Sequence, residues 1–259
     1  MTTTPRAACA ADDRGRITFG LALPDAEGQQ VLLRLRPKTG QPEKTVRVLD
    51  MEATGEGHAS AVLDADAVLE EGRWDVFLLR GSERTRLRPG HRDLRELVDG
   101  HLREWPSPLA VRIPYVTKDG YLAIRTWLRP AHAEAGRVDV TDRTLRVEGL
   151  LHGAVLRDGA EVLLRVRGAE DVVRVPLTRT QTRAFSFGVD HEQLGDGVWN
   201  VFVRPAPGAP PVRLARLLDD VADRKSVFVY PSTAVGDAIV RPYYTLDNDL
   251  SVEVKRAAR

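Results

Sequence analysis

The sequence contains little cysteine and few aromatic residues, and it has no long apolar run. Cys9 is the single cysteine among 259 residues, which excludes an internal disulfide framework and a zinc site built on cysteines. No apolar segment approaches the ~20 residues that a membrane-spanning helix needs. Residues 1–13 contain no apolar core of the kind found in a secretory signal, and we expect them to form a disordered tail. These absences predict a soluble, cytoplasmic protein.

Neither sign of charge dominates the sequence. Lys and Arg together number 38 and Asp and Glu 37, so the formal net charge is +1. This balance gives no whole-chain field that would attract nucleic acid or an anionic membrane, although it is compatible with a local patch, and we expect no nucleic acid partner and no membrane span. The length allows one large domain or two domains of about 120 residues, because domains commonly contain roughly 100–200 residues.

Short segments in which apolar and polar residues alternate make up most of the chain. Examples are residues 31–36, 74–78 and 121–127. Side chains of a strand point alternately to opposite faces, so this pattern predicts strands with one buried face. Strands at intervals of about 8–12 residues are typical of an antiparallel sandwich or barrel. We expect helix only at two short stretches, 93–98 and 217–222.

The order of these segments repeats along the chain. The turn at Asp119-Gly120, which we expect to be a two-residue type I′ turn, returns as Asp247-Asn248, with Asn replacing Gly where a positive φ is needed. Three longer segments also recur: 28–36 as 159–167, 69–78 as 194–203, and 111–120 as 239–248.

This internal repetition predicts an all-β chain made of two tandem copies. We expect a tandem repeat of two immunoglobulin-like antiparallel β-sandwich domains, at residues 14–130 and 137–259, joined by a linker at 131–136. Each copy carries one Trp-x-Val-Phe segment, so we expect Trp74 and Trp199 to anchor two separate cores.

Residue patterns with catalytic meaning are weak in this sequence. His91-Arg-Asp-Leu94 is similar to a protein-kinase catalytic loop, but Val98 stands where a metal-binding Asn is required. Asp64-Ala-Asp66 and Asp247-Asn-Asp249 have the spacing of a glycosyltransferase metal site, but no strand–helix nucleotide-binding unit accompanies them. No two histidines fall at i, i+2 or i, i+4. We therefore expect no catalytic residues, no metal site and no cofactor.

The best candidates for ligand binding lie in two related segments that contain Arg, Pro and Tyr. An arginine can bind a carboxylate or phosphate through its guanidinium fork, and a tyrosine can stack on a sugar ring. A structural alternative stays open, in which Pro marks a strand edge, Tyr packs half-buried and Arg covers the sheet with its stem. The candidate residues are Arg112, Tyr115 and Lys118 in the first copy and Arg241, Tyr243 and Tyr244 in the second.

The segments 212–225, 227–231 and 240–252 resemble the accessory β domains of actinobacterial glycosyltransferases. In that family these domains follow a catalytic domain that builds or decorates teichoic-acid-like wall polymers. The resemblance extends over both copies and is most specific at residues 194–254. It implies an immunoglobulin-like fold and a role in oligomerisation, polymer binding or the positioning of a partner enzyme. The catalytic domain of that family has no counterpart in this sequence, so the resemblance implies no transferase activity.

Three interpretations follow from these observations. The first is a non-catalytic binding or assembly module linked to a glycosyltransferase or cell-wall polymer pathway, with a glycosyltransferase or an anionic polysaccharide as partner. The second is a transferase-like enzyme with a site in the groove between the two copies. The third is a structural homo-oligomer that pairs exposed strand edges. The lack of a catalytic pattern favours the first interpretation.

Overall fold

The chain is all-β in a computed structural model, and it divides into two compact units. The first unit comprises Met1–Trp105, Ala110–Leu128 and Leu218–Ala222, and the second comprises Pro106–Leu109, Arg129–Leu217 and Asp223–Arg259. No helix of the described residues is long and apolar enough to cross a membrane. The structure describes residues 4–23, 27–37, 40, 42, 46–55, 57–99 and 107–256.

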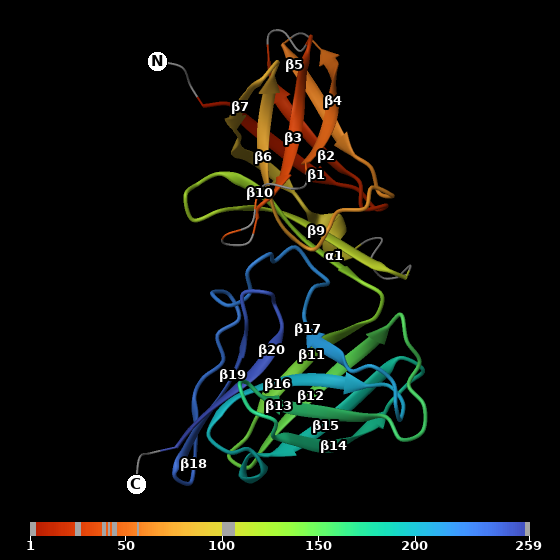
Figure 1. The fold of residues 1–259 in the computed structure, drawn as a ribbon, viewed down its shortest axis with the longest axis vertical. Helices are drawn as coiled ribbons and strands as arrows, with labels where there is room; N and C mark the ends of the chain where they lie inside the picture. The colour runs from red at the N-terminus through yellow and green to blue at the C-terminus, as the bar shows by residue number, and fades with distance from the viewer. Residues whose placement is uncertain are drawn as a thin grey trace. The chain divides into compact units, whose positions relative to one another are not determined.

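The first unit is built on one ten-stranded sheet (Figure 1). Its strands pair in the order β8-β1-β2-β5-β4-β3-β6-β10-β9, with β7 paired to β6. A short helix, α1 (Arg95–Asp99), follows β8. The strands are β1 (Arg6–Ala11), β2 (Ile17–Ala22), β3 (Gln29–Leu35), β4 (Val46–Gly55), β5 (His58–Leu63), β6 (Gly72–Arg80), β7 (Glu83–Arg86), β8 (Arg88–Asp93), β9 (Leu109–Val116) and β10 (Leu122–Arg129).

The second unit is built on another ten-stranded sheet. Its strands pair in the order β13-β14-β15-β12-β11-β17-β16-β20-β19-β18, and β13 also pairs with β16. A single 3-10 turn, η2 (His191–Gln193), precedes β16. The strands are β11 (His132–Val140), β12 (Thr144–His152), β13 (Glu161–Val166), β14 (Val172–Arg179), β15 (Ala184–Asp190), β16 (Gly197–Arg204), β17 (Val212–Ala215), β18 (Thr233–Val235), β19 (Ala238–Tyr244) and β20 (Leu250–Arg256).

The two sheets share one pairing order. In the first unit the strands pair in the order β8-β1-β2-β5-β4-β3-β6-β10-β9. In the second unit the corresponding strands pair in the same order, β17-β11-β12-β15-β14-β13-β16-β20-β19. Even the parallel pair is repeated, since β1 runs parallel to β8 and β11 runs parallel to β17. In the second unit the β13–β16 pairing closes seven strands into a ring, and both units have a barrel-like arrangement. The repetition seen in the sequence is therefore also a repetition of strand topology.

Each unit has its own core, and a tryptophan lies in each as expected. Trp74 is 1% exposed and Trp199 is 4% exposed. The indole N–H of Trp74 donates to the carbonyl of Glu70 at 3.0 Å, and that of Trp199 donates to the carbonyl of Gly195 at 2.9 Å. The two polar N–H groups are thus satisfied inside apolar surroundings in the same way, which keeps the cost of burying them low.

The β9–β10 and β19–β20 turns keep the equivalent Gly and Asn, but they are not type I′ turns. Gly120 and Asn248 have φ values of 78° and 61°. Each turn is closed by two backbone hydrogen bonds. In the first, Gly120 N–H donates to Thr117 O (2.9 Å) and Thr117 N–H to Tyr121 O (2.9 Å); in the second, Asn248 N–H donates to Thr245 O (3.0 Å) and Thr245 N–H to Asp249 O (2.9 Å). One residue with positive φ is sufficient here, whereas a type I′ turn requires two. The loops, residues 117–121 and 245–249, are longer than two residues, which explains the difference from the expected turn.

Three expectations about local structure are wrong. Residues Arg6–Ala11 of the expected tail form β1, because Ala and Cys side chains alternate into the core there; residues 1–3 of that tail lie outside the described part. His132–Val140 forms β11, so residues 132–136 of the expected linker belong to a strand. The stretch 217–222 contains no helix, whereas α1 does lie in the stretch 93–98 and extends one residue beyond it.

Candidate functional site

Arg112 on β9 is a buried structural residue. Its guanidinium donates to the carbonyl oxygens of Asp64 at 2.7 Å, Ala65 at 2.6 Å and Ala67 at 3.3 Å. Burial lowers the pKa of Arg112. The side chain ties β9 to the turn after β5, and it meets the Asp64-Ala-Asp66 segment through backbone oxygens. This contact accounts for Arg112 by packing and hydrogen bonding alone.

Arg112 and Arg241 do not occupy equivalent positions in the two units. The repeat aligns Arg112 with Val240 and Ile113 with Arg241. A shift of one residue moves a side chain to the other face of a strand, so the two arginines face opposite ways. Arg241 is exposed, and its guanidinium lies 2.8 Å from the carboxylate of Glu253.

Tyr244 belongs to the core of the second unit. Its ring is fully buried, meets Phe228 edge-on at 5.9 Å between ring centroids and lies 6.2 Å from Tyr230. Burial raises the pKa of the Tyr244 hydroxyl. Tyr243 precedes it on β19, faces the other way and is half-buried. Of the two neighbouring tyrosines, Tyr243 is the one that can reach a ligand from solvent.

The two remaining candidates, Tyr115 and Lys118, lie in and after β9. Lys118 is exposed in the turn that follows the strand. Tyr115 is half-buried, and burial raises the pKa of its hydroxyl, while the positive charges of Arg73 and Arg125 oppose that rise. Tyr115 therefore lies beside a group of arginines that the sequence analysis did not single out.

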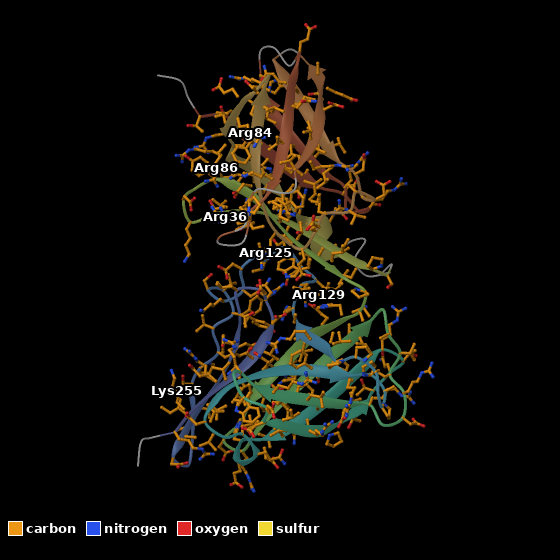
Figure 2. The ribbon with its side chains drawn as sticks, viewed as in Figure 1. Arg36, Arg84, Arg86, Arg125, Arg129 and Lys255 are labelled. Atoms are coloured by element: carbon orange, nitrogen blue, oxygen red, sulfur yellow. The ribbon has the colours of Figure 1, made fainter. Side chains whose placement is uncertain are left out.

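Arginines from neighbouring strands gather on the outward face of β6. Arg34 on β3 stands opposite Asp75, and Arg125 on β10 stands opposite Arg73. Figure 2 shows the side chains of Arg36, Arg84, Arg86 and Arg125 in the same unit. We define the first arginine surface as Arg34, Arg36, Arg73, Arg86 and Arg125 around Asp75.

One carboxylate lies beneath four of these guanidinium groups. Asp75 is 1% exposed. Its Oδ1 lies 2.9 Å from Arg73 and 3.5 Å from Arg86, and its Oδ2 lies 3.5 Å from Arg34 and 3.6 Å from Arg36. A single negative charge cannot balance four positive charges. The face of β6 therefore carries a local positive field, although the whole chain is nearly neutral.

Aromatic rings support three of the arginines, including Arg125, whose guanidinium lies 5.4 Å from the ring centroid of Trp127. The guanidinium of Arg86 lies 4.0 Å from the ring centroid of Tyr121, and that of Arg34 lies 4.7 Å from the centroid of Phe77. Arg86 also lies 3.3 Å from the carboxylate of Asp119. Cation–π contacts of this kind orient a guanidinium without neutralising its charge. The arginines are therefore held in place yet keep their capacity to bind an anion.

The second unit carries a related surface around Asn200, the residue that aligns with Asp75. The Oδ1 of Asn200 accepts a hydrogen bond from Arg213 at 3.0 Å and another from Arg167 at 3.3 Å. The ring of Phe202 lies beneath Arg213 at 4.9 Å and beneath Arg165 at 5.2 Å. We define the second arginine surface as Arg165, Arg167 and Arg213 around Asn200.

Arg213 is more fully satisfied than its counterpart Arg86. It also donates to the hydroxyl of Ser251 at 2.9 Å and lies 3.4 Å from the carboxylate of Asp249. Burial lowers the pKa of Arg213, and the charge of Asp249 opposes that shift. The second arginine surface thus has the same layout as the first but more internal hydrogen bonding.

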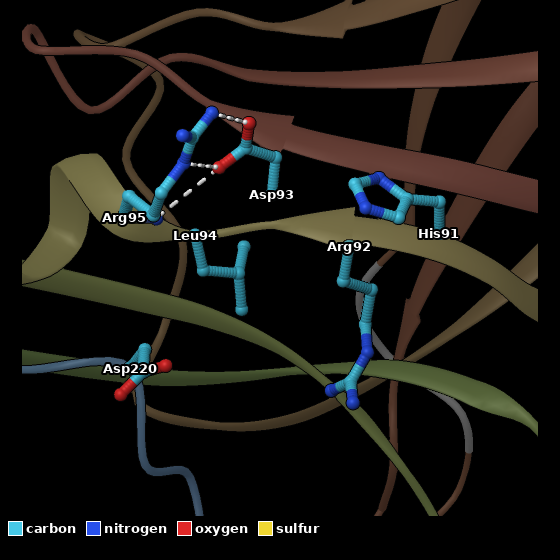
Figure 3. A pocket seen from close by; sticks show the side chains of 6 residues that line it. All are labelled: His91, Arg92, Asp93, Leu94, Arg95 and Asp220. Atoms are coloured by element: carbon cyan, nitrogen blue, oxygen red, sulfur yellow. Dashed lines mark hydrogen bonds and ion pairs between the residues drawn. The ribbon is translucent and has the colours of Figure 1, made fainter.

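The segment that is similar to a kinase loop lines a pocket of about 500 Å³ in the first unit (Figure 3). Arg95 binds Asp93 through two contacts of 2.5 and 2.8 Å, and this hydrogen bonding lowers the pKa of Asp93 to about 2. His91, Arg92 and Asp220 complete the lining. Because the Asp93 carboxylate is paired and weakly basic, it is poorly suited to act as a general base.

A buried polar group lies at the start of the second sheet. His132 Nε2 lies 2.7 Å from Glu134 Oε2, and the same oxygen accepts the backbone N–H of Leu217 at 2.8 Å. The ring of His152 stacks on that of His132 at 6.2 Å between centroids. Burial, followed by the neighbouring His132, lowers the pKa of His152 to about 4. This group connects Leu217, which follows β17, to β11, and its three side chains are buried.

No cluster of three His, Cys, Asp or Glu side chains suited to a metal ion occurs among the residues that the structure describes. Cys9 is buried in β1, and burial raises the pKa of its thiol to about 12. The thiol is protonated at neutral pH, which makes it a poor nucleophile.

Comparisons with known proteins give only distant matches. No family model and no curated protein matches the chain. Among solved structures, TarS of S. aureus matches 76% of this chain with 17% identity and a TM-score of 0.32, and this chain covers 38% of TarS. The match to a maltotriose-bound pullulanase from Anoxybacillus sp. LM18-11 covers 76% of this chain and 24% of the pullulanase chain, with 10% identity and a TM-score of 0.28.

The match to a marsupial T cell receptor covers 98% of this chain and 92% of the receptor chain, with 7% identity and a TM-score of 0.28. TM-scores this low do not establish a shared fold. The chain also spans well under two thirds of the TarS chain that it matches.

The sequence contains a signal for the arginine surfaces in the spacing of its arginines. Arg34 and Arg36 alternate in one repeated segment, and Arg165 and Arg167 alternate in its copy. Residues two apart share a strand face, so this spacing predicts two arginines side by side in each unit. The cross-strand neighbours Arg73 and Arg125 could not be assigned, because strand register depends on pairing that the sequence does not state.

Proposed function

We propose that this chain is a non-catalytic binding module for an anionic polysaccharide, and that it assists a glycosyltransferase or a cell-wall polymer pathway. The observation that carries this proposal is the duplicated cluster of arginines and one aromatic ring on the outward face of β6 and of β16. Guanidinium groups bind carboxylate, phosphate and sulfate groups, and an aromatic ring fixes their orientation.

Two features support binding rather than catalysis. The first arginine surface offers four guanidinium groups around one carboxylate, which is an excess of positive charge without a nucleophile or base. Positive charge repeated along a chain suits a polymer that carries repeated negative charge, because several weak contacts then act together. The pathway itself is supported by the sequence resemblance to accessory domains of glycosyltransferases, which also motivates our proposal of an immunoglobulin-like fold. We also propose a cytoplasmic location.

Calorimetric titration of the full chain tests this proposal. We expect dextran sulfate to bind at low ionic strength and uncharged dextran of the same length not to bind. Affinity should fall as salt rises, because salt screens exposed charges. The double substitution Arg34→Gln and Arg165→Gln removes one arginine from each surface and should weaken binding.

The matched control is the pair Arg137→Gln and Arg174→Gln, which removes the same charge at exposed positions outside both surfaces. Equal weakening in the control would assign binding to net charge alone. An absence of binding to dextran sulfate at low salt would refute the proposed function.

A further inference from the structure

Three arginines form a row across adjacent strands of the first unit. The backbone N–H of Arg36 donates to the carbonyl of Arg73 at 2.8 Å, and Arg125 stands directly opposite Arg73 on β10. Strands β3, β6 and β10 are neighbours in the sheet. The side chains of Arg36, Arg73 and Arg125 therefore emerge side by side on one face. We call this set the arginine row.

Such a row is unfavourable unless an anion compensates it. Like charges directly opposite each other on paired strands destabilise a sheet. Asp75 contacts Arg73 at 2.9 Å and Arg36 at 3.6 Å, but its charge is shared with Arg34 and Arg86 as well. A residue pattern that costs stability and stays exposed on one side is typical of a binding site. The exposed fraction of the Arg36 side chain is 48%, so a ligand in solvent can reach the row.

The second unit lacks the row and so provides an internal comparison. The backbone N–H of Arg167 donates to the carbonyl of Val198 at 2.7 Å, and Val198 stands opposite Glu253. These residues align with Arg36, Arg73 and Arg125. Where the first unit has three positive charges, the second has one positive, one neutral and one negative side chain. Shared fold requirements therefore do not explain the row.

We propose that the arginine row is a site for a tetrahedral oxyanion, such as a sulfate ester or phosphate ester group. This inference rests on the proposed function and deepens it, because it names the charged group and the unit that binds it. Asp75 acts as a positioning residue that holds Arg73 and Arg36 in place.

The geometry favours a tetrahedral anion over a carboxylate. The three guanidinium groups come from neighbouring positions, Arg36 just after β3, Arg73 on β6 and Arg125 on β10, and a sulfate or phosphate group offers several oxygen atoms to separate donors. A carboxylate offers two oxygens in one plane, which suit a single guanidinium fork. Tyr115 is half-buried on β9, the strand next to β10, and it can contact the group to which the oxyanion is attached.

NMR titration of the full chain with sodium sulfate tests the site. We expect saturable shifts of the arginine Nε–Hε signals of Arg36, Arg73 and Arg125 at constant ionic strength. Sodium phosphate should behave in the same way, whereas sodium acetate should bind about tenfold more weakly. Saturation separates specific binding from the general stabilising effect of sulfate.

Arg125→Gln is the test variant, and Arg137→Gln, at an exposed position outside both arginine surfaces, is the matched control. We expect the first to weaken sulfate binding by about tenfold and the second to leave it unchanged. Asp75 and Arg73 stay untouched in both, so the fold of β6 is preserved.

Equal sulfate affinity in the wild type and in Arg125→Gln would overturn the inference, as would acetate that binds as tightly as sulfate. If dextran sulfate still binds in that case, the proposed function stands and only the site is wrong. If sulfate binds at the row but no anionic polymer binds, the polymer-binding function fails while the oxyanion site remains.

Discussion

Asp75 and Asn200 occupy equivalent positions in the two units, each directly after the buried tryptophan of its core. The carboxylate of Asp75 lies among four guanidinium groups, whereas the amide oxygen of Asn200 accepts hydrogen bonds from Arg213, Arg167 and Ser251. The charged Asp75 thus lies in the first unit, which has the arginine row. The neutral Asn200 lies in the second unit, where residues of mixed charge replace the row.

This relationship predicts that Asp75→Asn destabilises the first unit. Removing the buried carboxylate that contacts four guanidinium groups increases the repulsion among them, and we expect a loss of about 2–4 kcal/mol. Sulfate at millimolar concentration should recover part of the loss by occupying the row. Chemical denaturation, followed by hydrogen exchange in each unit, measures the effect.

The reverse change, Asn200→Asp, serves as the comparison for that prediction. It adds a carboxylate next to Arg213 and Arg167, so we expect it to change stability by less than about 1 kcal/mol. Similar losses in both variants would show that the charge of Asp75 is unimportant and that only the shape of the side chain matters.

The two tryptophans predict unfolding that is confined to one unit at a time. Each lies in a separate core, so Trp74→Ala should lower the stability of the first unit, and Trp199→Ala that of the second, by about 3–5 kcal/mol. Hydrogen exchange read by mass spectrometry locates the loss. Full retention of the melting transition in either variant would contradict the assigned role.

The turns predict different tolerance at two equivalent positions. Gly120 has a φ of 78°, and nothing but the Arg88 side chain lies within 4 Å of an added Cβ, so Gly120→Asn should cost less than about 1 kcal/mol. Gly120→Val should cost more, because β-branched residues avoid positive φ. Thermal unfolding of both variants checks this order, and equal losses would argue against backbone strain.

Asn248 has an additional role that glycine cannot supply. Its side-chain oxygen accepts the backbone N–H of Arg224 at 3.0 Å while the residue is fully buried. Asn248→Gly keeps the backbone conformation but leaves that N–H without its partner, so we expect a loss of about 1–3 kcal/mol. Asn248→Ala adds backbone strain to the same loss and should be worse, and a smaller loss for Ala than for Gly would contradict this account.

The buried His152 predicts that the second unit loses stability as pH falls. Its pKa is about 4 in the folded chain against 6.5 as the ordinary value, mainly because of burial. Above pH 6.5 the ring is neutral in both states. As pH falls from 6.5 towards 4 the unfolded chain binds a proton that the folded chain does not, so stability falls by at most about 3 kcal/mol.

Denaturation of the second unit at pH 7.5 and at about pH 4.5 measures this loss. His152→Gln should flatten the pH dependence in that range, because the titrating group is removed. His58→Gln, at an exposed position of the first unit, is the control and should leave the dependence of the second unit intact. An unchanged slope in His152→Gln would assign the pH effect to other groups.

Sequence patterns predicted the strands well where apolar residues were large. Val31, Leu33, Trp74 and Val76 alternate clearly, and all four are buried. The pattern failed at β1, because Ala7 and Cys9 are small and give only a weak apolar periodicity. It also failed at β11, because the mutual pairing of His132 and Glu134 allows polar side chains to be buried.

The candidate site was predicted only in part. Tyr115 and Tyr243 are half-buried on outward faces as the expected ligand contacts require, whereas Arg112 and Tyr244 face inward. Arg and Tyr can lie on either face of a strand, and the sequence does not settle which. The expected ligand role of Tyr115, Tyr243 and Arg241 stays a prediction.

By itself the sequence determined the all-β class, the repetition of strands and the positive φ at Gly120 and Asn248, although not the type of turn in which these residues lie. These features depend on local periodicity and backbone freedom, which a chain carries along its length. Only the tertiary structure decided that Arg36, Arg73 and Arg125 meet in one row. Residues of three strands become neighbours through register, and register is set by the packing of the whole sheet rather than by any single segment.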